Sequence, residues 1–175
     1  MANSEFRNYG YIDRVLKDLG WNTKNPRNGG QVYFQGEFLN HDDLLSQSLN
    51  LQKPENIVLI PWEGGNFYWV IEAKSHHNNL EVALGEAQDY ANIINKSGKN
   101  DYARFATGIA GTPDSTFLVR TSFWNGESWS EVSINNHSAT GLLSCEQCQD
   151  ILARNEPHTD QIDDDPFRFL KKQML

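Results

Sequence analysis

The sequence has little cysteine, little positive charge and no long apolar segment, and each shortage argues against a class of protein. Only 2 of the 175 residues are Cys, too few for a disulfide framework, which suits a reducing compartment such as the cytoplasm. The longest uninterrupted apolar run is five residues, Phe67 to Ile71, so we expect no membrane-spanning helix and no membrane partner. The stretch from Met1 to Glu5 has neither the basic nor the apolar region of a signal peptide.

Basic residues are outnumbered, because 15 Lys and Arg stand against 23 Asp and Glu and give a net charge of −8. This acidity argues against a surface that binds polyanions everywhere, but it allows an enzyme with a local nucleic-acid site. Five of the negative charges lie in residues 156–165, which contain no Lys or Arg and are followed by Pro166. We therefore expect one domain over residues 1–155, then an acidic linker and the start of a further helix over residues 156–175. A helix that starts so late suggests that the chain is a piece of a longer protein.

Aromatic residues are abundant, with 5 Trp, 6 Tyr and 9 Phe, and they indicate a folded core. Apolar residues at helical spacing predict helices over residues 4–19, 79–95 and 144–154, with a short helix or loop at 41–45. Aromatic and β-branched runs predict strands at 32–34, 56–60, 67–71, 105–110, 116–124 and 129–134. This order predicts an α/β fold with a mixed central β-sheet flanked by helices.

One of these strands ends with an acid and a lysine that share a face. Alternation along the strand places Glu72 and Lys74 on one side and Ile71 and Ala73 on the other. A solvated ion pair at a strand end would contribute little stability. As a site, the carboxylate would bind a hard cation such as Mg²⁺, and the ammonium would orient or activate a water molecule beside it.

The preceding strand supplies a second acid if the two strands form a hairpin. A two-residue turn at Gly64-Gly65 would place Glu55 opposite Lys74 and Ile57 opposite Glu72. Cross-strand partners share a face, so Glu55 would join the site and Asn56 would point to the other side. A three-residue turn would reverse this assignment, because a one-residue slip moves every side chain to the opposite face.

These residues resemble a known nuclease signature. Pro54-Glu55 followed by Glu72-Ala73-Lys74 resembles the PD-(D/E)xK motif, with Glu as the first acid. The ordered set of a helix ending Leu19-Gly20-Trp21, the hairpin and a helix containing Glu86 and Tyr90 resembles the N-terminal nuclease domain of type I restriction enzyme R subunits. It equally resembles the same domain fused ahead of an adenine-specific DNA methyltransferase. The resemblance covers roughly residues 5–135.

The resemblance implies a restriction-endonuclease-like fold and a Mg²⁺-dependent (or Mn²⁺-dependent) endonuclease that hydrolyses phosphodiester bonds of double-stranded DNA. It implies that Glu55 and Glu72 are metal ligands and that Lys74 orients the attacking water or stabilises the phosphorane charge. It also implies that Glu86 and Tyr90 lie near the substrate, since the family carries a Q-x-x-x-Y motif on this helix. Other domains or subunits of a restriction-modification complex would then be partners.

Two departures from the family pattern support an alternative. The first acid is Glu55, followed by Asn56, where the family usually has Asp, and Glu86 replaces the helix Gln. If Asn56 took the place of the aspartate, its neutral amide would bind Mg²⁺ poorly. The alternative is therefore an inactive nuclease-fold module that contacts DNA or scaffolds a larger protein. An unpaired, buried lysine, which we expect at Lys74, argues against this alternative, because a site that has lost its activity has no physical need for one.

Overall fold

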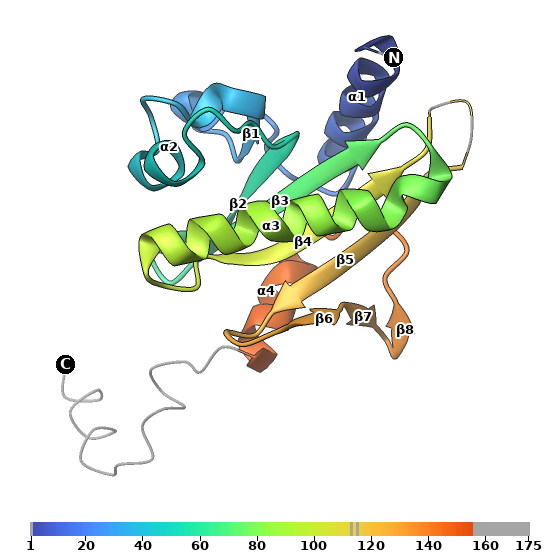
Figure 1. Cartoon of the computed structure of the whole chain (residues 1–175). Helices are drawn as coiled ribbons and strands as arrows, with labels where there is room; N and C mark the ends of the chain where they lie inside the picture. The colour runs from blue at the N-terminus through green and yellow to red at the C-terminus, as the bar shows by residue number, and fades with distance from the viewer. Residues whose placement is uncertain (1, 113, 115, 156–175) are drawn as a thin grey trace, which may run out of the picture.

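The part of the chain that the structure describes folds as a mixed α/β structure with a six-stranded sheet and four α-helices (Figure 1). The structure, a computed structural model, describes residues 2–112, 114 and 116–155, so the linker and helix expected at 156–175 lie outside the described residues. The helices are α1 (Ala2–Asp18), α2 (Asp43–Leu49), α3 (Leu80–Gly98) and α4 (Cys145–Asn155), with 3-10 turns η1 (Pro26–Asn28), η2 (Gln35–Phe38) and η3 (His77–Asn79). The strands are β1 (Val32–Phe34), β2 (Asn56–Trp62), β3 (Gly65–Lys74), β4 (Ala103–Ala110), β5 (Leu118–Trp124), β6 (Trp129–Glu131), β7 (Ser133–Ile134) and β8 (His137–Ser138). Within these ranges no helix is long and apolar enough to cross a membrane.

The main sheet is mixed, and helices cover both of its faces, as the sequence predicts. Its strand order is β1-β2-β3-β4-β5-β6, and β3 and β4 are parallel while the other neighbours are antiparallel. The helix α3 forms the crossover between β3 and β4 and lies across one face, whereas α4 lies behind the sheet (Figure 1). Two apolar cores result: residues of α1 and α4 pack on one face, and residues of α2 and α3 pack on the other.

The three long helices and the central strands follow the predicted ranges within a few residues. The predicted strand over residues 129–134 is the exception, because it divides into β6 and β7. The division lies at Val132, whose side chain is buried and whose N–H donates to the carbonyl of Thr121. Burying this side chain takes the chain out of the main sheet and into the separate β7–β8 ribbon.

The turn between β2 and β3 differs from the prediction, and the difference sets the register. The two central residues are Glu63 (φ 45°) and Gly64 (φ 84°), so Trp62 pairs with Gly65. Left-handed backbone at both positions is the type I′ geometry that matches strand twist, and glycine adopts it freely at the second position. The predicted turn at Gly64-Gly65 is therefore wrong by one residue, and the pairing is wrong by two, because Ile57 pairs with Val70 instead of Glu72. Because the shift is even, every side chain keeps the face predicted for it.

A glycine in β4 lets α3 lie close against the sheet beside β3. Gly108 pairs with Glu72, and a Cβ atom at Gly108 would lie 2.4 Å from the backbone nitrogen of Leu84. Glycine in a strand interior commonly marks such a close approach. The glycine therefore brings the first half of α3 towards the end of β3.

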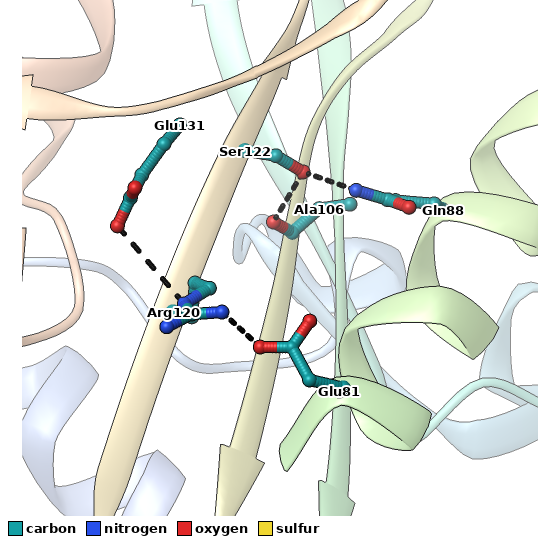
Figure 2. Close-up of polar contacts among 6 residues, drawn as sticks. All are labelled: Glu81, Gln88, Ala106, Arg120, Ser122 and Glu131. Carbon is teal, nitrogen blue, oxygen red and sulfur yellow. Dashed lines mark hydrogen bonds and ion pairs between the residues drawn. The ribbon is translucent and has the colours of Figure 1, made fainter.

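Polar contacts also connect α3 to β5, the strand next to β4 (Figure 2). Nε2 of Gln88 donates to Oγ of Ser122 at 3.0 Å. Arg120 forms an ion pair with Glu81 of α3 and lies 4.0 Å from a carboxylate oxygen of Glu131 on β6. The close approach at Gly108 and the polar contacts to β5 together fix α3 on the sheet. They therefore limit how far the side chains of α3 can move relative to β3.

Candidate functional site

The acid and the lysine predicted on β3 lie at the end of the strand, on the face covered by α3. Their neighbours Ile71 and Ala73 point into the opposite core with α1 and α4. Glu72 is only 8% exposed, whereas the side chain of Lys74 is 30% exposed. The strand thus carries the buried carboxylate of Glu72 and, two residues further along the chain, the ammonium of Lys74, which reaches solvent.

Glu55 lies beside Glu72, although not in the pairing that the sequence suggests. It immediately precedes β2, and its backbone N–H donates a 2.7 Å hydrogen bond to Oε1 of Glu72. Its carboxylate is close enough that its charge raises the pKa of Glu72. The expected shared face of Glu55, Glu72 and Lys74 is present, while the expected pairing of Glu55 with Lys74 is wrong because of the register shift.

Asn56 points away from this group, into the other core. It pairs with Ile71 in the hairpin, and only 1% of its surface is exposed. Neither its amide nitrogen nor its amide oxygen has a hydrogen-bond partner among the described residues. Asn56 is therefore not the side chain that accompanies Glu72, and of the two candidates for the first acid the geometry selects Glu55.

The helix α3 brings two further predicted residues to the same place. Oε2 of Glu86 lies 3.0 Å from Nζ of Lys74, so the two form an ion pair. Tyr90 lies one helical turn after Glu86 on the same side of α3. Burial raises the pKa of Tyr90, the charges of Glu72 and Glu86 raise it further, and the charge of Lys74 lowers it. The expectation of an unpaired, buried Lys74 is wrong, because the lysine is ion-paired and partly exposed.

The electrostatics of the group are dominated by the burial of Glu72, and neighbouring acids add to its effect. Burial raises the pKa of Glu72 from 4.5 to about 8, the N–H of Glu55 opposes this, and the charges of Glu55 and Glu86 add to it. The charge of Lys74 lowers the pKa but does not balance the two acids. A cation bound here would have to displace the proton of Glu72 at neutral pH.

The donor set fits Mg²⁺ or Mn²⁺ in the way that phosphate-transfer sites bind these ions. Such ions are commonly held by one or two carboxylates, with water and substrate phosphate completing the shell. Glu55 and Glu72 supply two carboxylates. Burial, and after it the charges of Glu55 and Glu86, disfavour the ionised form of Glu72, and a divalent cation would favour that form. Within the described part of the chain, no cluster of three or more His, Cys, Asp or Glu forms a complete protein-only metal site.

Gly108 is the contributor to the site that the sequence does not reveal. It carries no chemistry, but it permits the close approach that brings Glu86 and Tyr90 to Glu72. A single glycine inside a predicted strand is the available signal, and it indicates a close backbone contact without showing what makes it.

His77, which follows Lys74 closely in sequence, lies outside the group. One of its ring nitrogens, Nε2, lies 2.5 Å from the carbonyl oxygen of Thr116. The imidazole therefore links the start of α3 to the loop before β5 and is occupied by that contact.

Comparisons with protein families, curated proteins and solved structures find no match to this chain, so the site is interpreted from its own geometry.

Proposed function

We propose that the chain is a restriction-endonuclease-like nuclease domain of the PD-(D/E)xK type that hydrolyses phosphodiester bonds of DNA with a divalent cation. One observation supports this most strongly: the β2–β3 hairpin brings Glu55 against Glu72 on the face that also carries Lys74. Glu55 belongs to the first part of the motif, and Glu72 and Lys74 belong to the second. Glu55 and Glu72 are 17 residues apart in the sequence. A mixed sheet flanked by helices is the architecture that the resemblance predicts.

The chemistry assigned to each residue follows from its position. A cation held by Glu55 and Glu72 would polarise a phosphate oxygen and acidify a bound water. Lys74 orients the attacking water and stabilises the charge that develops on the phosphate. Attack of the water oxygen on phosphorus breaks the bond to one sugar oxygen, and the products are a phosphate monoester and a free hydroxyl.

The contacts made by α3 give Glu86 and Tyr90 supporting roles in this proposal. Glu86 holds the ammonium of Lys74 at 3.0 Å and so sets where the lysine points before DNA arrives. The phenol of Tyr90 is influenced by the charges of Glu72 and Glu86, and in this proposal it donates a hydrogen bond to a phosphate oxygen of the DNA. Removing either residue should therefore impair catalysis less than removing Glu72 or Lys74.

The proposal includes the partners that the resemblance implies. The substrate is double-stranded DNA, and further domains or subunits of a restriction-modification enzyme would supply sequence recognition. A surface with a net charge of −8 is a poor general DNA binder, which favours a domain that depends on attached modules. The near absence of cysteine favours the cytoplasm.

The alternative is an inactive domain of the same kind that contacts DNA or scaffolds a larger protein. The ion pair between Lys74 and Glu86 favours it, because a lysine neutralised by a neighbouring carboxylate is less available to a phosphate. The buried Glu72 beside the half-buried Glu55 favours the active enzyme, since burying a carboxylate costs stability that only a function would justify.

Nicking of supercoiled plasmid in the presence of Mn²⁺ tests the active enzyme. We expect the wild type to nick the plasmid and Lys74→Gln to lose most of this activity, because the substitution removes the ammonium and keeps the hydrogen-bonding side chain. Lys17→Gln on α1, whose lysine is 62% exposed, removes the same charge far from the site and should leave the activity unchanged. Mn²⁺ binding without nicking by the wild type would favour the inactive module, and nicking unaffected by Lys74→Gln would contradict the site.

A further inference from the structure

A recess of about 540 Å³ lies at the other end of α3, beside the hairpin formed by β5 and β6. Its lining includes the exposed Lys96 and Lys99 at the end of α3, together with Asp101 and the half-buried indole of Trp124. Figure 1 shows the C-terminal end of α3 and the turn between β5 and β6 at the same end of the sheet, on the left of the view. The recess shares none of its lining residues with the Glu55–Glu72–Lys74 group.

Trp124 lines this recess, and Trp129 packs against Trp124 to form an aromatic pair beside it. Trp124 and Trp129 are cross-strand partners, with ring centroids 5.3 Å apart and an interplanar angle of 51°. The indole N–H of Trp124 donates to Oδ1 of Asp101 at 2.8 Å, and that of Trp129 donates to Oδ1 of Asn92 at 3.2 Å. Such a pair stabilises a hairpin by itself, yet both rings remain partly exposed in orientations that these hydrogen bonds fix.

The charge beside these rings is positive, in contrast to the molecule as a whole. Neither Lys96 nor Lys99 forms an ion pair with a residue that the structure describes. The acid in the recess, Asp101, is already engaged by the Trp124 N–H, and it lies close enough to the buried Arg104 to raise the pKa of that guanidinium against the effect of burial. The two lysines are therefore the uncompensated charges of the recess.

We propose that this recess binds an unpaired segment of DNA. Exposed indole faces stack on bases only where the bases are not already stacked in a duplex, and lysines at the rim bind the phosphates. This combination of fixed aromatic rings and uncompensated lysines fits a polyanion with flat rings better than a neutral ligand. The choice of DNA rests on the proposed nuclease function, whereas binding at the recess requires neither the cation nor cleavage.

The position of the recess relative to the proposed active site fits a strand that extends beyond the cleavage point. Glu86 and Lys96 are ten residues apart on α3, which corresponds to about 15 Å along the helix axis. This distance spans on the order of four stacked nucleotides of one strand. A strand held at the recess would therefore lie within a few nucleotides of Lys74.

Quenching of tryptophan fluorescence by oligo(dT) of about twelve nucleotides, in EDTA, tests the proposal. We expect saturable quenching by wild type and a roughly tenfold loss of affinity in Lys96→Gln/Lys99→Gln. The slope of log K against log salt should also become smaller by about 1.4, because two phosphate contacts are lost. The matched control Lys17→Gln/Lys24→Gln removes two exposed lysines elsewhere and should bind like the wild type.

Three outcomes would overturn the proposal: no quenching, equal affinity in the two double variants, or equal affinity for a DNA duplex of the same length. Quenching by a neutral oligosaccharide that is insensitive to salt would instead assign the recess to carbohydrate. Glu72→Gln should bind oligo(dT) like the wild type, because it alters only the proposed metal site. Absence of nicking by the wild type together with oligo(dT) binding at the recess would reject the nuclease function and leave the recess assignment standing.

Discussion

The backbone N–H of Glu55 donates a 2.7 Å hydrogen bond to Oε1 of Glu72, which joins the residue before β2 to the buried acid of β3. The bond comes from the main chain, so it does not depend on the side chain at position 55. It fixes the carboxylate of Glu72, while burial and then the charges of Glu55 and Glu86 disfavour ionisation of that carboxylate. The backbone thus holds in place an acid whose pKa is strongly perturbed, which is a common property of functional sites.

The raised pKa of Glu72 predicts a stability that falls with pH in metal-free buffer. The unfolded chain releases the Glu72 proton near pH 4.5, whereas the folded protein keeps it until about pH 8. Stability from this group is therefore complete below about pH 4.5 and is lost as the pH rises through about 8. Over this window the wild type should lose about 2–4 kcal/mol more than Glu72→Gln, which cannot ionise.

Urea unfolding at several pH values, with EDTA present, measures this difference. The conservative variant Glu146→Gln changes an exposed acid in the first turn of α4 and serves as the control, because it should follow the wild-type pH dependence. Parallel pH profiles for the wild type and Glu72→Gln would show that Glu72 ionises normally in the folded protein.

Substitution of Gly108 should separate α3 from the sheet. In Gly108→Ala the new Cβ would meet the backbone of Leu84 at 2.4 Å, and a backbone contact cannot be relieved by a side-chain rotation. We expect a loss of about 1–3 kcal/mol in the free energy of unfolding, measured by urea denaturation. The matched control is Gly85→Ala on α3, where no atom lies within 4 Å of the new Cβ and a gain of about 0.5–1 kcal/mol is expected. Equal effects of the two substitutions would contradict the close approach.

Glu86→Gln should release Lys74 without unfolding the protein. The side chains of the ion pair are 30% and 40% exposed, so the pair contributes no more than about 1 kcal/mol. At saturating Mn²⁺ we expect plasmid nicking to fall by less than it does in Lys74→Gln, because the ammonium remains but loses the carboxylate that positions it. Asp89→Asn on the same helix removes an exposed charge and should leave the rate unchanged. A loss of nicking comparable to that of Lys74→Gln would show that Glu86 itself is required.

Asn56→Val should stabilise the protein. The amide is 1% exposed and has no partner among the described residues, so its replacement removes a desolvated polar group from the core. We expect a gain of about 1–2 kcal/mol in the free energy of unfolding. Asn66→Val, at an exposed position of β3, is the control and should change stability by less than about 0.5 kcal/mol. A loss of stability in Asn56→Val would indicate that the amide is bonded in solution.

The sequence predicts the order of helices and strands well because apolar periodicity is a local property. Alternation along β3 correctly assigns Glu72 and Lys74 to one face and Ala73 to the other. A two-residue turn assigns Glu55 to the site and Asn56 to the opposite face, and the observed register, shifted by two residues, keeps that assignment, whereas the three-residue turn that would reverse it is not formed.

The contacts within the site are not predictable from the sequence, because they depend on tertiary packing. Turn chemistry alone does not distinguish Glu63-Gly64 from Gly64-Gly65, so the residue opposite Glu55 was predicted incorrectly. The ion pair of Lys74 with Glu86 depends on the distance between α3 and the sheet. This distance is short because position 108 is glycine. The restriction-endonuclease-like assignment and the DNA substrate stay predictions from the resemblance.

The most direct test of the central claim is calorimetric titration of Mn²⁺ into wild type and Glu72→Gln at about pH 9, where the buried carboxylate is ionised. We predict binding by wild type, unchanged binding by Glu146→Gln and an affinity at least about tenfold lower in Glu72→Gln, or about 1.4 kcal/mol. Below pH 8 wild-type binding should also release a proton, since the pKa of Glu72 is raised to about 8. The absence of binding heat from wild type, or equal binding by Glu72→Gln, would contradict the proposed metal site.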